Sequence, residues 1–220
     1  MHILDNPIRS DELLVETIDI DHRFYASSAE PLTHKELIEW TRENGDDALI
    51  NLFNDHSLGY ADNGGSQDVR EELATLYDDS ISADNIVIFP GAQTAMTITT
   101  FAMIHNGDHA VIITPSYQSL EEGVKYAGGT VTRVGLTPEN NWQIDVDAVR
   151  NAIQDNTKYL ILNDPHNPSG SLLKENIKKE LVSIAEEKDI LILSDEVYRL
   201  LEINPDDRSN SIAEMTQNGI

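Results

Sequence analysis

The feature that most restricts the fold of this chain is a series of short runs that consist almost wholly of apolar residues. The clearest runs are, in chain order, Ile86-Val87-Ile88-Phe89, Ala110-Val111-Ile112-Ile113, Tyr159-Leu160-Ile161-Leu162 and Ile190-Leu191-Ile192-Leu193, with Thr130-Val131-Thr132-Arg133-Val134 as a weaker fifth. Each run is too short for a helix and ends in polar or turn-forming residues. Runs of this kind indicate strands that are buried on both faces, as in a parallel sheet.

Helical patterns fill the intervals between these runs. They cover residues 66–78, 92–105, 117–127, 145–154 and 174–188. The alternation predicts a wound α/β domain, a three-layer α/β/α arrangement with a mostly parallel sheet. Residues 1–45 are polar and irregular with one expected helix, which Thr33 caps and Glu36 completes as a capping box. We therefore divide the chain into an N-terminal segment, 1–45, and a main domain, 46–220.

Ligands of wound sheets bind at the carboxyl ends of the strands, and the residues after Phe89 suit a phosphate there. The small residues Gly91 and Ala92 lead directly into a helix, and Gln93 and Thr94 lie in its first turn. The first N–H groups of a helix have no intrahelical partner and attract anions. The alternative is a tight strand-to-helix turn without a ligand.

Two further expected strands end in aromatic, amide or acidic residues. Tyr117 can offer its face to a flat ring, or it can serve as a packing or capping residue. The octapeptide Asn163–Gly170 (Asn-Asp-Pro-His-Asn-Pro-Ser-Gly) forms a rigid loop that can hold Asn167 in one orientation. We expect His166 to orient this loop rather than to act as a base.

Asp195 and Tyr198 follow the last apolar run. An acid at the end of a buried strand is costly unless a cation pairs with it, and a protonated pyridine nitrogen is such a cation. Tyr198 can direct its hydroxyl to the same ring. The alternative, a metal site at Asp195 and Glu196, lacks a second acidic or histidine cluster with suitable spacing.

Together these segments resemble the class I/II aminotransferases, the aspartate aminotransferase superfamily of fold-type-I pyridoxal-phosphate (PLP) enzymes. The segments that carry the resemblance are Leu58-Gly59-Tyr60, Asn63-Gly64-Gly65, Val69–Ala74, Gly91–Ala95, Pro115–Tyr117, Asp164–Gly170 and Ser194–Tyr198, within about residues 48–200. The pairing of Asp164–Gly170 with Asp195–Tyr198 is the most specific part. Asp164 stands where the usual motif has Asn, and Ser169 stands where Thr is common.

The resemblance implies a PLP-transferase large domain, with residues 1–45 contributing to a small domain, and it implies roles for the site residues. Backbone N–H groups of Ala92 and Gln93 would bind the PLP phosphate with Thr94 nearby, Tyr117 would stack on the ring, Asn167 and Tyr198 would bond the 3′-oxygen, and Asp195 would pair with the ring nitrogen. Tyr60 resembles the residue that reaches the phosphate of a neighbouring subunit, which implies a homodimer.

The lysine that bonds PLP in this family, the Schiff-base lysine, lies in a Ser-x-x-Lys loop beyond the segment that contains Asp195. No such loop surrounds any lysine of this chain: Lys35, Lys125, Lys158, Lys174, Lys178, Lys179 and Lys188. We expect the last four to lie on solvated helix faces. The chain is therefore expected to be a fragment, incomplete at its C-terminus and inactive alone, whose sheet would take a further strand from later sequence.

The expected function is that of a PLP-dependent aminotransferase acting on an amino acid and a 2-oxo acid. One alternative is a catalytically inactive PLP-fold module for binding or interaction. A second is an unrelated wound nucleotide-binding protein, although the sequence contains no nucleotide fingerprint.

Composition excludes several other classes of function. The formal net charge of −24 disfavours binding to nucleic acid or an anionic membrane. The absence of cysteine excludes disulfides, thiolate catalysis and cysteine zinc sites. A sequence without cysteine fits a reducing, cytoplasmic location best. The sequence also contains no apolar run long enough to span a membrane and no signal-peptide pattern at its start.

Overall fold

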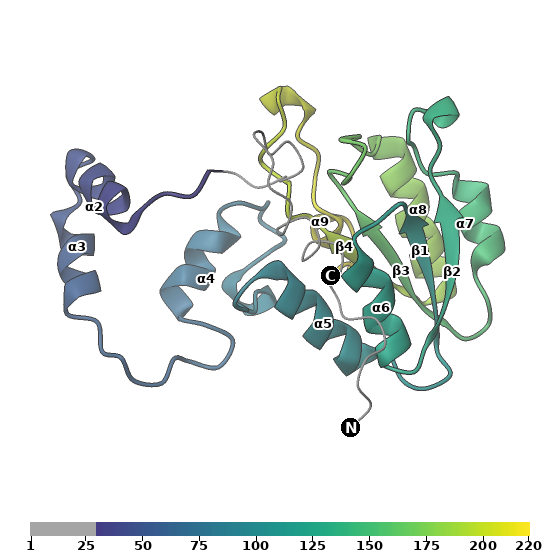
Figure 1. Cartoon of the computed structure of the whole chain (residues 1–220), viewed down its shortest axis with the longest axis horizontal. Helices are drawn as coiled ribbons and strands as arrows, with labels where there is room; N and C mark the ends of the chain where they lie inside the picture. The colour runs from purple at the N-terminus through teal and green to yellow at the C-terminus, as the bar shows by residue number, and fades with distance from the viewer. Residues whose placement is uncertain (1–29) are drawn as a thin grey trace, which may run out of the picture. The chain divides into compact units, whose positions relative to one another are not determined.

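A computed structural model of the chain describes residues 30–220, which separate into two compact units, residues 30–61 and residues 62–220. The first unit contains α2 (His34–Glu43) and α3 (Asp47–Asn54). The helices of the second unit are α4 (Gln67–Ala74), α5 (Ala92–Met103), α6 (Gln118–Tyr126), α7 (Val146–Ala152), α8 (Glu175–Lys188) and α9 (Ile212–Met215) (Figure 1). The predicted helices are therefore present, each within a few residues of its expected bounds.

A parallel sheet forms the centre of the second unit. Its strands are β1 (His109–Thr114), β2 (Thr130–Gly135), β3 (Thr157–Asn163) and β4 (Leu191–Asp195), in the spatial order β2-β1-β3-β4. Every neighbouring pair is parallel. The predicted parallel α/β arrangement is confirmed for these four strands, including the weaker run that becomes β2.

Alternate residues of the strands pack on opposite faces of the sheet. Ala110 and Ile112 of β1 join one core cluster, while Val111 and Ile113 join the other. Helices α5 and α6 cover the first face through residues such as Met96, and α7 and α8 cover the second (Figure 1). Burial on both faces is the reason why these strands are apolar along their whole length.

The strand predicted at Ile86–Phe89 is wrong, because this segment joins no sheet within residues 30–220. Its backbone makes two separate bonds to preceding turns, from the N–H of Ile88 to the carbonyl of Gly64, 2.9 Å, and from the N–H of Ile86 to the carbonyl of Ala83, 3.2 Å. Val87 is largely exposed. An apolar run forms a strand only where a neighbouring chain offers a ladder of partners, and no strand described here lies beside this one.

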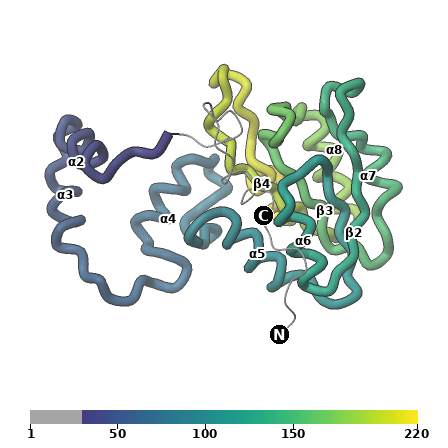
Figure 2. The backbone as a smooth tube through the Cα atoms, in the orientation of Figure 1, coloured from purple at the N-terminus to yellow at the C-terminus, as the bar shows by residue number. Residues whose placement is uncertain are grey.

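The last residues of the chain lie along the outer edge of β4. The N–H of Ile192 donates to the carbonyl of Asn218, and the N–H of Ile220 donates to the carbonyl of Ile192, 2.8 and 2.9 Å. Before this point the chain leaves β4, passes through a short 3-10 helix at Pro205–Asp207 and returns through α9 (Figure 2). Residues 218–220 therefore form an isolated parallel bridge to β4 at this edge.

The unit of residues 30–61 has the predicted N-terminal cap. Thr33 and Glu36 form the complete capping box of α2, so this prediction is confirmed. Asn44–Asp46 separates this helix from α3. Helix α3 was not predicted. Asp46 caps it by accepting a bond from the N–H of Leu49. Whether residues 1–45 contribute to a small domain stays a prediction.

A crowded glycine marks the start of the second unit. Gly65 has φ +97°, and a Cβ placed on it would lie 2.6 Å from the side chain of Ile88. Arg70 fixes the same turn, because its guanidinium donates to the carbonyls of Gly65 and Ala83. The glycine and arginine of the segment that resembles the aminotransferases thus have structural roles.

Gly65→Ala should destabilise the chain strongly, because it adds a side-chain clash to an unfavourable backbone conformation. Gly107→Ala is the matched control, since Gly107 has φ +91° with nothing within 4 Å of the added Cβ. We expect the control to lose roughly 1–2 kcal/mol of unfolding free energy and Gly65→Ala to lose about 1–3 kcal/mol more. Urea denaturation measures both, and equal losses would contradict the packing described here.

Candidate cofactor-binding site

Two polar side chains end neighbouring strands at the carboxyl edge of the sheet. Asn163 is the last residue of β3, Asp195 is the last residue of β4, and the two are partners in the ladder. Asn163 follows Ile161 by two residues, and Asp195 follows Leu193 by two. Since side chains two residues apart in a strand share a face, both lie on the face that α5 and α6 cover.

Asp195 is a buried acid that lacks a cation within residues 30–220. Its side chain is 8% exposed. Burial raises the pKa of the carboxyl above its ordinary value of 3.8, and the N–H of Val197, 3.2 Å from Oδ1, offsets this only in part. Removing a carboxylate from water without a counter-charge is costly. The site is therefore electrostatically suited to a cationic group of a ligand.

The loop after β3 presents Asn167 to Tyr198. Asn163 Oδ1 accepts a bond from the N–H of Asn167, 2.6 Å, and Asn163 Nδ2 donates to the carbonyl of Asp195, 2.7 Å. Asn167 Nδ2 donates to the hydroxyl of Tyr198, 3.1 Å. The structure thus joins three of the predicted site residues (Asn167, Asp195 and Tyr198) through Asn163, a residue to which the sequence interpretation gave no individual role.

His166 joins the same loop to the one that follows β1. It is buried, and its Nε2 donates to the carbonyl of Pro115, 2.8 Å. Its Nδ1 lies 2.7 Å from the Oγ of Ser169. Both ring nitrogens therefore have partners, which confirms the expected orienting role. The bond to Pro115 also fixes the turn that contains Tyr117.

Tyr117 precedes α6 and packs against the core cluster on the face of α5 and α6. The packing role that the sequence left open is thus present. Stacking of Tyr117 on a ligand ring stays a prediction.

The N-terminus of α5 begins at a turn with an unusual backbone. Gly91, at the N-cap, has φ 93°, and nothing lies within 4 Å of a Cβ added there. The N–H groups of Thr94 and Ala95 donate to the carbonyl of Gly91. Ala92 and Gln93 come before Thr94 and Ala95, so their N–H groups have no intrahelical partner and are available to an anion. The hydroxyl of Thr94 donates to the carbonyl of Pro90, 3.1 Å.

Two other candidates from the sequence are described separately. Tyr60 belongs to the unit of residues 30–61, and it is fully exposed there. Glu196 anchors the start of α9, since its Oε1 accepts bonds from the hydroxyl of Ser211 and the N–H of Ile212. In the part of the chain that the structure describes, no cluster of three or more histidine or acidic side chains could hold a metal ion.

One lysine prediction is wrong. Lys178 does not lie on a solvated helix face, because it is 3% exposed and forms an ion pair with Asp164, which is 4% exposed. Its position in α8 follows the helical period of buried Leu181 and Val182, and this period is the signal that identifies it as an inward-facing residue. Lys174, Lys179 and Lys188 are exposed, as expected.

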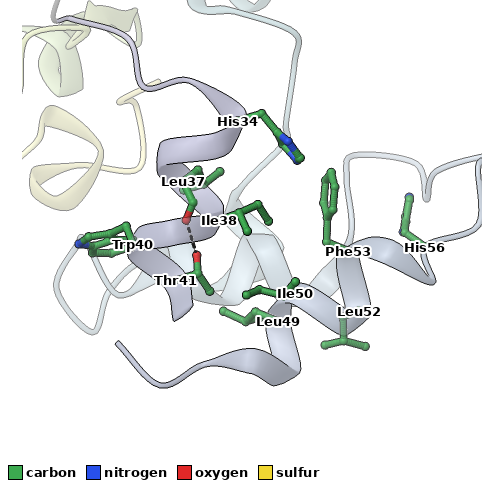
Figure 3. A pocket seen from close by; sticks show the side chains of 10 residues that line it. All are labelled: His34, Leu37, Ile38, Trp40, Thr41, Leu49, Ile50, Leu52, Phe53 and His56. Atoms are coloured by element: carbon green, nitrogen blue, oxygen red, sulfur yellow. Dashed lines mark hydrogen bonds between the residues drawn. The ribbon is translucent and has the colours of Figure 1, made fainter. Parts of the chain in front are cut away.

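A separate apolar cavity of about 650 Å³ lies between α2 and α3 (Figure 3). Leu37, Ile50 and Phe53 line it, and the ring of His34 lies 5.1 Å from that of Phe53. The hydroxyl of Thr41 is not directed at a ligand, because it donates to the carbonyl of Leu37. Most of the side chains that line this cavity are apolar. None of the helices in residues 30–220 is long and apolar enough to cross a membrane.

The pattern of the family described as "Aminotransferase class I and II" matches residues 27–217. This chain belongs to the class I and II aminotransferases. An aspartate aminotransferase of Sulfolobus acidocaldarius is 30% identical over 159 residues, 71% of this chain and 40% of that protein. A probable aspartate aminotransferase of Methanocaldococcus jannaschii is 34% identical over 143 residues, 63% of this chain and 38% of that protein.

Solved aminotransferases share the fold. A PLP-dependent aminotransferase from Streptococcus suis has a TM-score of 0.77 at 31% identity, over 87% of this chain and 50% of that one. Aspartate aminotransferase from Thermus thermophilus with maleate has a TM-score of 0.71 at 28% identity, over 78% of this chain and 46% of that one. The fold class predicted from the sequence is thus confirmed. The chain spans about two fifths of the length of the two curated relatives, 40% and 38%.

PLP is the cofactor of this family, and two features of the site fit its chemistry. Among the described residues, the buried Asp195 has no cationic partner, and a protonated pyridine ring supplies one. The N–H groups at the start of α5 suit a phosphate. Both features belong to the unit of residues 62–220.

Asp195→Asn should stabilise the ligand-free chain at neutral pH. Because burial raises the folded-state pKa of Asp195, the unfolded chain releases this proton at a lower pH than the folded chain does. The stability contribution of this group is full below its ordinary pKa of 3.8 and is lost as pH rises through the raised pKa. The gain in unfolding free energy of the variant over the wild type should therefore shrink as pH falls toward that ordinary value.

Urea denaturation between about pH 5 and pH 8 measures this gain. Asp155→Asn, at an exposed position, is the control and should show no comparable pH-dependent difference. A variant at Asp195 that is less stable than the wild type at neutral pH would show that the buried carboxylate is already compensated.

Proposed function

We propose that residues 62–220 form the PLP-binding part of an aminotransferase that acts on an amino acid and a 2-oxo acid. The observation that carries the proposal is the buried carboxyl of Asp195 at the end of β4, which has no cationic partner within residues 30–220. Membership of the aminotransferase family supplies the kind of ligand that fits it. When bound, PLP supplies an electron sink for bond breaking at the Cα of the amino acid.

Each site residue has a proposed task, which the family resemblance implies and its place in the fold supports. Asp195 pairs with the ring nitrogen and keeps a proton on it. The side chains of Asn167 and Tyr198, which are joined by a hydrogen bond, face the 3′-oxygen of the ring. Tyr117 stacks on the ring, as the resemblance implies.

The phosphate is bound by the N–H groups of Ala92 and Gln93, with Thr94 adjacent. The bond from the Thr94 hydroxyl to Pro90 suggests that this side chain fixes the turn as well. A strong local site is needed here, because the net charge of −24 opposes the binding of an anion.

The proton transfer at Cα is proposed to need a lysine that this sequence does not contain. Among its lysines, Lys178 is buried, but its Nζ contacts Asp164, Ser209 and Asn210. We therefore propose that the chain binds PLP without forming a covalent bond to it and does not transaminate by itself. No observation in residues 30–220 or in the comparisons favours an inactive interaction module instead.

We further propose a homodimeric, cytoplasmic enzyme. Tyr60 is fully exposed in its own unit, which fits a residue that serves a neighbouring subunit in a homodimer. The absence of cysteine fits a cytoplasmic protein. Several relatives are aspartate aminotransferases, so an acidic amino acid is a reasonable first substrate to test with a complete enzyme.

Ala92→Pro tests the phosphate site, because proline removes one proposed N–H donor and leaves the helix intact. Ala92 is the first residue of α5, where proline is tolerated, and Gly91 with ψ 147° accepts a following proline. Loss of one charge-assisted bond should raise the Kd for PLP about tenfold or more. Titration followed by the absorption spectrum of PLP measures the change.

Glu175→Pro is the matched control, since Glu175 is the exposed first residue of α8 and Lys174 before it has ψ 141°. This variant should bind PLP as the wild type does. Absence of any spectral change or thermal stabilisation by PLP in the wild-type chain would contradict the proposed function. Equal effects of the two proline variants would contradict the phosphate site.

A further inference from the structure

A buried ion pair lies directly behind the loop that holds Asn167. Asp164 Oδ2 and Lys178 Nζ are 2.5 Å apart, and their side chains are 3% and 4% exposed. Asp164 follows Leu162 by two residues, and Leu162 packs on the face of the sheet covered by α8. The pair is therefore on the face opposite to Asn163 and Asp195, so Asp164 does not contact a ligand on the α5 side.

The polar groups of the pair are well satisfied. Besides Asp164, the ammonium of Lys178 donates to the hydroxyl of Ser209, 2.7 Å, and to the carbonyl of Asn210, 3.1 Å, which uses all three of its N–H donors. Asp164 Oδ1 accepts a bond from the N–H of Leu173, 2.9 Å. A buried ion pair is retained without a large penalty only when its remaining groups are bonded in this way.

Hydrogen bonds of Asp164 hold both ends of the loop that runs from Asp164 to Leu173. The N–H of Asp164 donates to the carbonyl of Asp195, 3.0 Å, and its carboxylate holds Leu173, where the loop ends. Asn167 lies between these two points. The ion pair thus connects the base of the loop to α8 and to the segment that precedes α9.

A second set of hydrogen bonds links the segment that Lys178 holds to the segment after β4. Ser211 follows the segment that Lys178 holds, and Glu196, next to Asp195, accepts bonds from the hydroxyl of Ser211 and the N–H of Ile212. Lys178 therefore supports the loop after β3 and the segment after β4 together. Asn167 and Tyr198 belong to these two segments and meet at a hydrogen bond.

We propose that Asp164 and Lys178 are positioning residues: their buried ion pair holds the loop Asp164–Leu173 so that Asn167 faces the ring 3′-oxygen of PLP. This inference rests on the proposed function for the identity of the ligand. Asp164 stands where the usual aminotransferase motif has Asn. The negative charge that this difference introduces is paired with the positive charge of Lys178 in α8. Restoring the common residue, Asp164→Asn, should therefore impair this chain, because it leaves the charge of Lys178 buried without its partner.

A double-mutant cycle tests the pair. The variants are Asp164→Asn, Lys178→Met and the double substitution, which removes both charges and keeps an acceptor for Leu173. Each single variant should raise the Kd for PLP about tenfold. The double variant should change Kd far less than the product of the single changes, because the second substitution removes the charge that the first left unpaired.

The second readout is hydrogen exchange in the ligand-free chain, which needs no cofactor. Exchange should rise at Asn167, Gly170 and Leu173 in the single variants and remain unchanged at the central strands β1 and β3. The control is Glu175→Gln with Lys179→Met, which removes an exposed ion pair of the same helix, 67% and 65% exposed. The control should alter neither exchange in the loop nor the Kd.

A failure of the proposed function and a failure of the positioning role give different results. A wild-type chain that binds no PLP would contradict the proposed function, and exchange in the loop would still decide the role of the pair. Multiplicative effects on Kd, or exchange that rises equally in the loop and the central strands, would overturn the positioning role. If a single variant does not fold, a double variant with protected loop amides and near-native Kd supports the coupling, and one with an exposed loop overturns it.

Discussion

The candidate site depends on one electrostatic constraint, the burial of the Asp195 carboxyl at the end of a central strand. Burial raises its pKa, and a hydrogen bond from the backbone N–H of Val197 offsets this only in part. A site with this property favours a cationic partner over water. In an aminotransferase, a protonated pyridine ring is such a partner, and the remaining polar contacts then serve to place that ring.

The groups proposed to bind PLP and the groups proposed to position them lie on opposite faces of the sheet. Asn163 and Asp195 lie on the face of α5 and α6, where the N–H groups of α5 begin. On the other face, Asp164 and Lys178 connect the loop after β3 to α8. One face thus carries the groups proposed to bind PLP, and the other carries the groups proposed to keep them in place. Because a strand alternates its side chains, adjacent residues such as Asn163 and Asp164 can serve both purposes.

Much of this arrangement could be predicted from the sequence, because burial on both faces leaves a plain apolar pattern in β1, β3 and β4. The loop of Asn167 was also predictable, since its prolines, asparagines and glycine have few other uses together. The strand at Ile86–Phe89 could not be excluded from the sequence, because its apolar pattern is the same as that of the true strands. Only the absence of a pairing neighbour within residues 30–220 distinguishes it. Lys178 was misassigned because a lysine on a helix is usually solvated, and its partner lies on another element.

The central claim is that Asp195 is the counter-charge of the PLP ring nitrogen. The nitrogen-15 chemical shift of ring-labelled PLP bound to this chain measures the claim directly. The account predicts a protonated ring nitrogen at a pH where free PLP has lost that proton, and loss of this proton in the Asp195→Asn variant. A bound ring nitrogen that is unprotonated in the wild type, or equally protonated in the variant, would contradict it.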